Sequence, residues 1–116
     1  MAARQRQTYG EEVANVLTHG AGMLFGMTAI IILMMAAIRS GNPWAIGSFA
    51  VYAVCMTLSY VTSTFYHAST HARQKRLLRR FDHGAIYLHI AGTYTPFTLL
   101  ALRQEGYWGW SLFAVI

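Results

Sequence analysis

Residues 13–38 read VANVLTHGAGMLFGMTAIIILMMAAI and contain no charged side chain. The run is 26 residues long, whereas a helix that crosses a bilayer needs about 20 mainly apolar residues. Because charged side chains are costly in hydrocarbon, an uncharged run of this length is typical of a transmembrane helix. We therefore predict a first membrane span over about residues 15–38.

Two further long runs without charge follow along the chain. Residues 40–72 are uncharged and are broken by a Gly-Asn-Pro turn signal, and residues 83–102 are uncharged as well. These runs predict a second span over about residues 44–67 and a third over about 82–102. The sequence therefore predicts an all-α, polytopic transmembrane helical bundle.

A fourth apolar run, residues 107–116, ends the chain and is too short to cross a bilayer. We expect the chain to be the N-terminal part of one larger transmembrane domain, with three full spans and the start of a fourth.

The composition also indicates a membrane protein, because 55% of residues are hydrophobic and 11% are charged, against about 25% charged in soluble domains. This excludes a soluble globular domain, a disordered chain and a free nucleic-acid-binding module. A single cysteine excludes an internal disulfide and a cysteine-based metal site.

Basic residues are unevenly distributed between the segments that join the predicted spans. Residues 68–81 hold five of the nine Lys and Arg residues, and the N-terminal tail holds Arg4 and Arg6. The positive-inside rule therefore predicts a multi-pass cell-membrane protein with a cytoplasmic N-terminus and a cytoplasmic second loop, residues 68–81. An alternative interpretation of this loop is a patch for lipid headgroups or nucleic acid. Aromatic residues expected near the opposite interface are Trp44, Tyr107, Trp108 and Trp110.

Small residues and proline indicate how the spans pack. Gly22 and Gly26 form a Gly-x-x-x-Gly pair, which predicts close approach of another helix to the first span. Pro96 predicts a local kink or loosening of the third span.

Polar and ionisable residues gather at one depth of the predicted bundle. Helical spacing places the polar side chains of each span on one face of its helix. Three helices can therefore direct these side chains toward one interior point. Imidazoles together with a carboxylate favour zinc, and a lone histidine at a helix end is the simpler alternative. Glu12, Asn15 and His19 open the first span, Ser63 and His67 close the second, and Asp82, His83 and His89 open the third.

Three segments together resemble one known family. They are EEVANVLTHGAG at 11–22, STFYH at 63–67 and FDHGAIYLHIAGTYTPF at 81–97. In this order they resemble the haemolysin III family of the progestin and adipoQ receptor group, which includes the adiponectin receptors. The resemblance implies a seven-helix membrane protein with a zinc site near the cytoplasmic side.

The resemblance also implies roles for individual residues. His67 would be a direct zinc ligand, Ser63 its motif partner one turn earlier, and Asp82 would lie close to the zinc-bound water. Glu12, Asn15 and His19 match the family's first-helix motif. The remaining zinc ligands would belong to a His-x-x-x-His motif on the last helix, which lies beyond the end of this chain at Ile116.

Three functions follow as expectations. The first is a zinc-dependent membrane hydrolase of a lipid amide or ester bond, with Asp82 and Ser63 as catalytic candidates. The second is a non-enzymatic regulator or sensor of membrane lipid state, for which zinc would be structural. The third, a pore-forming cytolysin, has less support, because a channel lining needs polar residues along whole helices and the outer halves here are apolar. The expected partners are the lipid bilayer, a lipid substrate and the remaining helices of the domain, with no nucleic acid.

Overall fold

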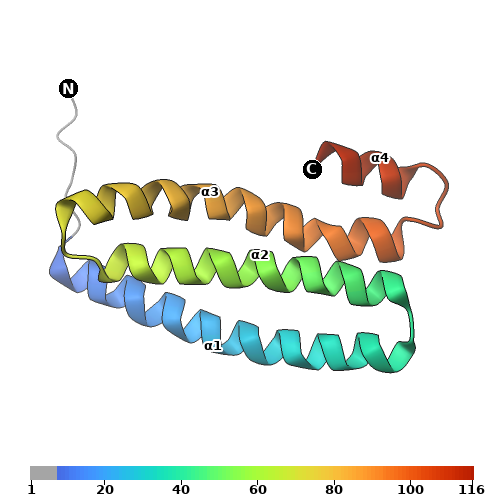
Figure 1. Ribbon diagram of the computed structural model, residues 1–116, viewed down its shortest axis with the longest axis horizontal. Coiled ribbons are helices and arrows are strands. Elements are labelled where there is room, and N and C mark those ends of the chain that lie inside the picture. The colour runs from blue at the N-terminus through green and yellow to red at the C-terminus, as the bar shows by residue number, and fades with distance from the viewer. Residues whose placement is uncertain (1–7) are drawn as a thin grey trace.

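Every regular element in the computed structural model, which describes residues 8–116, is a helix. Helices α1, α2 and α3 run side by side in one row with α2 in the middle, and α4 folds back beside the far end of α3 (Figure 1). The chain measures 50 × 32 × 19 Å, so it is a thin layer of helices. The predicted all-α fold is confirmed. The elements are α1 (Tyr9–Ser40), α2 (Pro43–Ala68), α3 (Ala72–Pro96), the π-helical turn η1 (Phe97–Ala101) and α4 (Trp108–Val115).

Helix α1 begins earlier than the predicted first span because a capping box sets its first turn. The Thr8 hydroxyl accepts a hydrogen bond from the Glu11 amide at 3.3 Å, and the Thr8 amide donates to the Glu11 carboxylate at 2.7 Å. The Thr-x-x-Glu pattern that forms this box is visible in the sequence. The earlier start matters because it places Glu12 within the helix.

The connection between α1 and α2 is the tight turn that the Gly-Asn-Pro signal predicts. Gly41 has φ +66°, a left-handed conformation that ends a helix at little cost only for glycine. The Asn42 side chain caps α2 by accepting a hydrogen bond from the Trp44 amide at 3.0 Å, and Pro43 occupies the first helical position. The turn makes α1 and α2 antiparallel neighbours.

The prediction that residues 68–81 form a loop is wrong from Ala72 onward. Only Ser69, Thr70 and His71 lie outside the helices, and the basic residues form the first turns of α3. Arg, Lys, Gln and Leu are good helix formers, whereas the positive-inside rule counts charges and contains no information on backbone conformation. Among the described helices, α1 and α2 are long and apolar enough to cross a membrane.

Glycines allow the helices to approach closely. A methyl group added to Gly22 would stand 2.8 Å from the Tyr60 ring of α2, and one added to Gly26 would clash with Met56. The predicted Gly-x-x-x-Gly contact is therefore present, between α1 and α2. Gly92 has the same role on the other side of α2, where an added methyl group would lie 3.0 Å from the Cys55 sulfur.

The far part of α3 loosens at its proline, as the sequence predicts. The α-helix ends at Pro96 and continues as the wider turn η1. Proline lacks an amide hydrogen, so the regular hydrogen-bond ladder is interrupted there. Gly109 of α4 packs against backbone atoms of Arg103 and Thr98, which brings α4 back onto this turn.

Candidate functional site

The Glu12 carboxylate joins three helices at the end of the layer where α1 begins, α2 ends and α3 begins (Figure 1). One of its oxygens, Oε2, lies 2.7 Å from Nδ1 of His67 on α2. The other, Oε1, accepts a hydrogen bond from the ammonium group of Lys75 on α3. The side chains of His67, Glu12 and Lys75 are 9%, 17% and 28% exposed, so the cluster is largely withdrawn from solvent. We call these three residues the carboxylate cluster.

The contact with Glu12 determines which nitrogen of His67 is free. An ionised carboxylate has no proton to donate, so His67 donates through Nδ1. In the neutral imidazole the other nitrogen, Nε2, then carries a lone pair. A histidine held in this way by a carboxylate is typical of metal ligands, in which the second nitrogen binds the metal.

The other two residues of the predicted first-helix group also lie beside His67. The Asn15 amide nitrogen is 3.5 Å from His67 Nδ1, and because both atoms are donors when Nδ1 binds Glu12, this is a contact and not a hydrogen bond. Nδ1 of His19 lies 2.8 Å from the Asn15 carbonyl oxygen, and the His19 ring stacks on the His67 ring with centroids 5.6 Å apart. The structure therefore brings together Glu12, Asn15, His19 and His67, which are up to 55 residues apart in the chain.

Two further residues of this region contact the predicted site residues. In the sequence, Lys75 is only one of the basic residues that predict the membrane topology. Its position beside Glu12 follows from the helical start of α3. Tyr60 lies between two histidines, with its ring centroid 6.4 Å from that of His19 and 5.9 Å from that of His89. Tyr60 thus connects His19 of α1 to His89 of α3. No sequence motif indicates either contact, because both join separate helices.

Ser63 and Asp82 lie at the same level of the bundle as His67. Ser63 is buried, with 5% of its surface exposed. Gly92 of α3 packs on Cys55 of α2, and the two helices are antiparallel. Asp82 is ten residues before Gly92, and Phe65 is ten residues after Cys55. Equal distances along the two helices therefore place Asp82 level with Phe65. Asp82 is half-buried and forms no hydrogen bond or ion pair with any residue between 8 and 116. His71 and His83 are exposed.

Within the part of the chain that the structure describes, no three His, Cys, Asp or Glu side chains converge as a metal site would require. The residues present can still supply part of the ligand set of such a site. His67 has a lone pair on Nε2 and a carboxylate that orients its ring, and the His19 imidazole lies beside it. Glu12 is occupied by His67 and Lys75, so it fits the role of an orienting group better than that of a ligand.

Comparison with known proteins identifies the family. The family described as Haemolysin-III related matches residues 7–116. The chain belongs to the haemolysin III family. It is 46% identical over 113 residues to Hemolysin-3 of Bacillus cereus and 43% identical over 109 residues to the Hemolysin-3 homolog of Bacillus subtilis (strain 168). These alignments cover 97% and 94% of the chain but 51% and 50% of the relatives, so the chain spans about half their length. No solved structure matches the chain.

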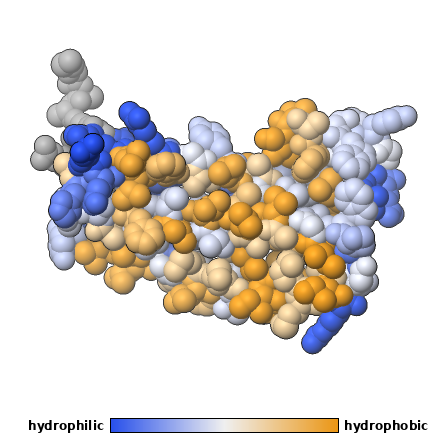
Figure 2. Space-filling view, viewed as in Figure 1, coloured by the Kyte–Doolittle hydropathy of each residue, from blue (hydrophilic) through white to orange (hydrophobic). Residues whose placement is uncertain are grey.

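Membership of the haemolysin III family makes this an integral membrane protein, and its surface agrees. Large apolar side chains are exposed along the middle of the helices, including Phe25 at 80%, Ile32 at 57% and Val54 at 58%. Figure 2 shows apolar side chains over the middle of the layer and strongly hydrophilic ones at its ends. Such a surface is stable against lipid and unfavourable in water.

Proposed function

We propose that this chain supplies part of a zinc site near the cytoplasmic side of a multi-pass cell-membrane protein, with His67 as a ligand through Nε2. The observation that carries the proposal is the 2.7 Å contact between His67 Nδ1 and the Glu12 carboxylate. It orients the ring and leaves Nε2 as the metal-binding nitrogen. Because the chain spans about half of its relatives, the other ligands would come from the remainder of the domain.

The residues of this chain would have distinct roles around such a site. Glu12 holds the His67 ring, and Lys75 neutralises the carboxylate so that its charge does not compete for the metal. Asp82 and Ser63 lie level with His67 on α3 and α2, where Asp82 would hold a proton close to the reacting group. Zinc bound there would lower the pKa of water and polarise a carbonyl group.

The reaction class that these groups support is hydrolysis of a lipid amide or ester bond. The polar groups occupy one end of the helices, and the residues beyond them are mainly apolar, as an acyl chain would require. We expect Asp82→Asn to abolish most hydrolysis while the zinc content stays unchanged. If purified, zinc-loaded protein cleaves no lipid and Asp82→Asn retains cellular function, the hydrolase proposal is wrong.

A non-enzymatic regulator or sensor of membrane lipid state is the second proposal. It is favoured by the way in which one carboxylate joins three helices, since this arrangement suits a structural centre. In that case His67→Ala would lower the thermal midpoint of unfolding, and Asp82→Asn would leave function intact. The two proposals therefore give opposite results for Asp82→Asn.

The experiment that tests the zinc site is elemental analysis of the purified full-length protein. We expect about one zinc per chain in the wild type and its loss in His67→Ala. Glu12→Gln should weaken zinc binding by about 10–100-fold, because the ring loses its orienting partner. His83→Ala is the matched control, since this histidine is exposed and lies outside the carboxylate cluster. Wild-type protein without zinc, or equal loss in His83→Ala, would refute the assignment.

A further inference from the structure

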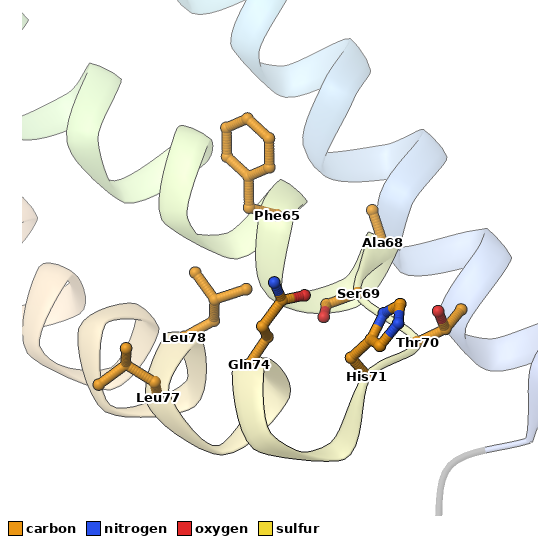
Figure 3. A pocket seen from close by; sticks show the side chains of 8 residues that line it. All are labelled: Phe65, Ala68, Ser69, Thr70, His71, Gln74, Leu77 and Leu78. Carbon is orange, nitrogen blue, oxygen red and sulfur yellow. The ribbon is translucent and has the colours of Figure 1, made fainter.

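A pocket of about 470 Å³ opens where the end of α2 meets the start of α3 (Figure 3). Its walls are apolar side chains of both helices, Phe65, Leu77 and Leu78, and its polar part is formed by Ser69, His71 and Gln74. An apolar wall beside a polar rim matches an amphiphilic ligand better than a purely polar or purely apolar one.

The pocket lies on the opposite face of α2 from the carboxylate cluster. Phe65 is two residues from Ser63 and two from His67. Because two residues turn a helix by about 200°, the Phe65 side chain points away from both. The exposures agree, because Phe65 is 62% exposed whereas Ser63 is 5% exposed. The pocket is therefore separate from the proposed zinc site, and it opens on a surface where the apolar side chains of Phe65 and Leu77 are exposed.

Exposed arginines flank the pocket along α3. Arg73 and Arg80 are exposed and lie within about 60° of Leu77 around the helix, so they form a stripe at this edge of the pocket, whereas Arg76 points farther from it. By the same spacing, Leu77 of the pocket wall lies between this stripe and Gln74 around the helix. Lys75 is on the other side of α3, where it binds Glu12. Figure 2 shows the strongly hydrophilic side chains of this end directly beside apolar ones.

The Ser69 hydroxyl provides an independent observation. Its oxygen is buried and has no hydrogen-bond partner among residues 8–116. Ser69 lines the pocket, and Figure 3 shows its side chain beside Gln74 and His71. Since buried polar groups are nearly always hydrogen-bonded, this hydroxyl has a hydrogen bond that it can donate to a ligand oxygen.

We propose that this pocket binds an anionic glycerophospholipid from the surrounding bilayer. The acyl chain lies along Phe65 and Leu77, and the headgroup phosphate lies between the Ser69 hydroxyl and the arginine stripe. Charge complementarity selects an anionic lipid over a zwitterionic one, because the stripe supplies positive charges at headgroup depth. The proposal is independent of the zinc site, since it uses other residues on the other face.

The test is photocrosslinking in nanodiscs that contain the full-length protein. The probes are phosphatidylglycerol and phosphatidylcholine with the same photoreactive group in the acyl chain, and mass spectrometry locates the crosslinks. We expect phosphatidylglycerol to label residues 65–78 about fivefold or more above phosphatidylcholine. Equal labelling by both probes, or labelling confined to other segments, would overturn the proposal. Loss of the label on adding inorganic phosphate would instead identify a free-anion site and would overturn it too.

Variants separate a bound lipid from a general attraction of the surface for anionic lipids. Arg73→Gln should lower phosphatidylglycerol labelling about fivefold, whereas the control Arg39→Gln, at the opposite end of α1, should leave it unchanged. Ser69→Ala should lower the labelling, and Ala68→Trp should abolish it by filling the pocket. An unchanged thermal midpoint shows that each variant is folded. Labelling that survives both Ser69→Ala and Ala68→Trp would contradict a bound lipid.

Discussion

The two ends of the helical layer are held together by different interactions. At the end where α1 begins, the Glu12 carboxylate binds His67 of α2 and Lys75 of α3. At the other end the contacts are aromatic, with the Trp44 and Trp110 rings 5.7 Å apart in a T-shaped pair and the Arg103 guanidinium 4.3 Å from the centre of the Trp44 ring.

This difference matches the chemistry that each end can carry. Hydrogen bonds to a carboxylate are directional and define the orientation of the His67 ring and the Lys75 ammonium group. Aromatic contacts are less directional and suit an interfacial belt, where tryptophan has an apolar face and one polar group. The end with directional contacts therefore has the candidate site, and the aromatic end serves to hold the helices together.

The largest effect is expected from removing the carboxylate. Glu12→Ala leaves the His67 and Lys75 side chains without their shared partner in a largely buried position. We expect a loss of about 3 kcal/mol in the free energy of unfolding, measured by denaturant titration in micelles. Glu12→Gln keeps an acceptor oxygen and should lose less. A Glu12→Gln variant as stable as the wild type would mean that the carboxylate charge has no special role, and no loss in Glu12→Ala would contradict the prediction.

The close contact between α1 and α2 at Gly22 lies between the two ends of the helical layer. We expect the second-largest effect there. Gly22→Val places a branched side chain against the Tyr60 ring and should cost about 2 kcal/mol, because overpacking forces the helices apart. Gly20→Val is the matched control, since no atom lies within 4 Å of a methyl group at Gly20. Unfolding titrations of the two variants test the difference, and similar stabilities would contradict the close approach at Gly22.

The capping box at the start of α1 should have a smaller effect. Thr8→Ala removes the hydroxyl that accepts from the Glu11 amide and should cost about 1 kcal/mol of stability. Thr8→Ser keeps the hydroxyl and should behave like the wild type. Hydrogen exchange of the first-turn amides of α1 is the measurement, and unchanged exchange in Thr8→Ala would show that the cap does not hold this turn.

The smallest effect belongs to the aromatic end. A double-mutant cycle with Arg103→Gln and Trp44→Leu should give a coupling free energy of about 0.5–1 kcal/mol, the usual range for a cation–π contact. A coupling energy larger than the loss in Glu12→Ala would reverse the comparison between the two ends. Tryptophan fluorescence reports whether the ring environment changes in each single variant.

Much of the fold is readable from local sequence features. The uncharged run over residues 13–38 indicates a long apolar helix, and the Gly-Asn-Pro signal indicates the turn that the structure has at Gly41. The start of α3 was predicted wrongly, because the basic residues were interpreted through their charge although their helix propensity also favours a helix there. The capping box at Thr8 was readable too, and it explains the early start of α1.

The candidate site is only partly readable. Spacing along each helix identifies which polar residues share a face, and so groups Glu12 with Asn15 and His19, and Ser63 with His67. It carries no information on which face meets which partner. The Glu12 to Lys75 contact and the place of Tyr60 between His19 and His89 therefore had no signal in the sequence.

The sequence by itself determined the all-helical fold, the membrane environment and the polar stripe on each helix, because these depend on local composition and on the period of the α-helix. Only the tertiary structure decided that one carboxylate meets a histidine and a lysine from two other helices. It also decided that a pocket opens where the end of α2 meets the start of α3. The physical reason is that contacts between helices depend on their relative rotation and level, which close packing at glycines such as Gly22 and Gly92 sets.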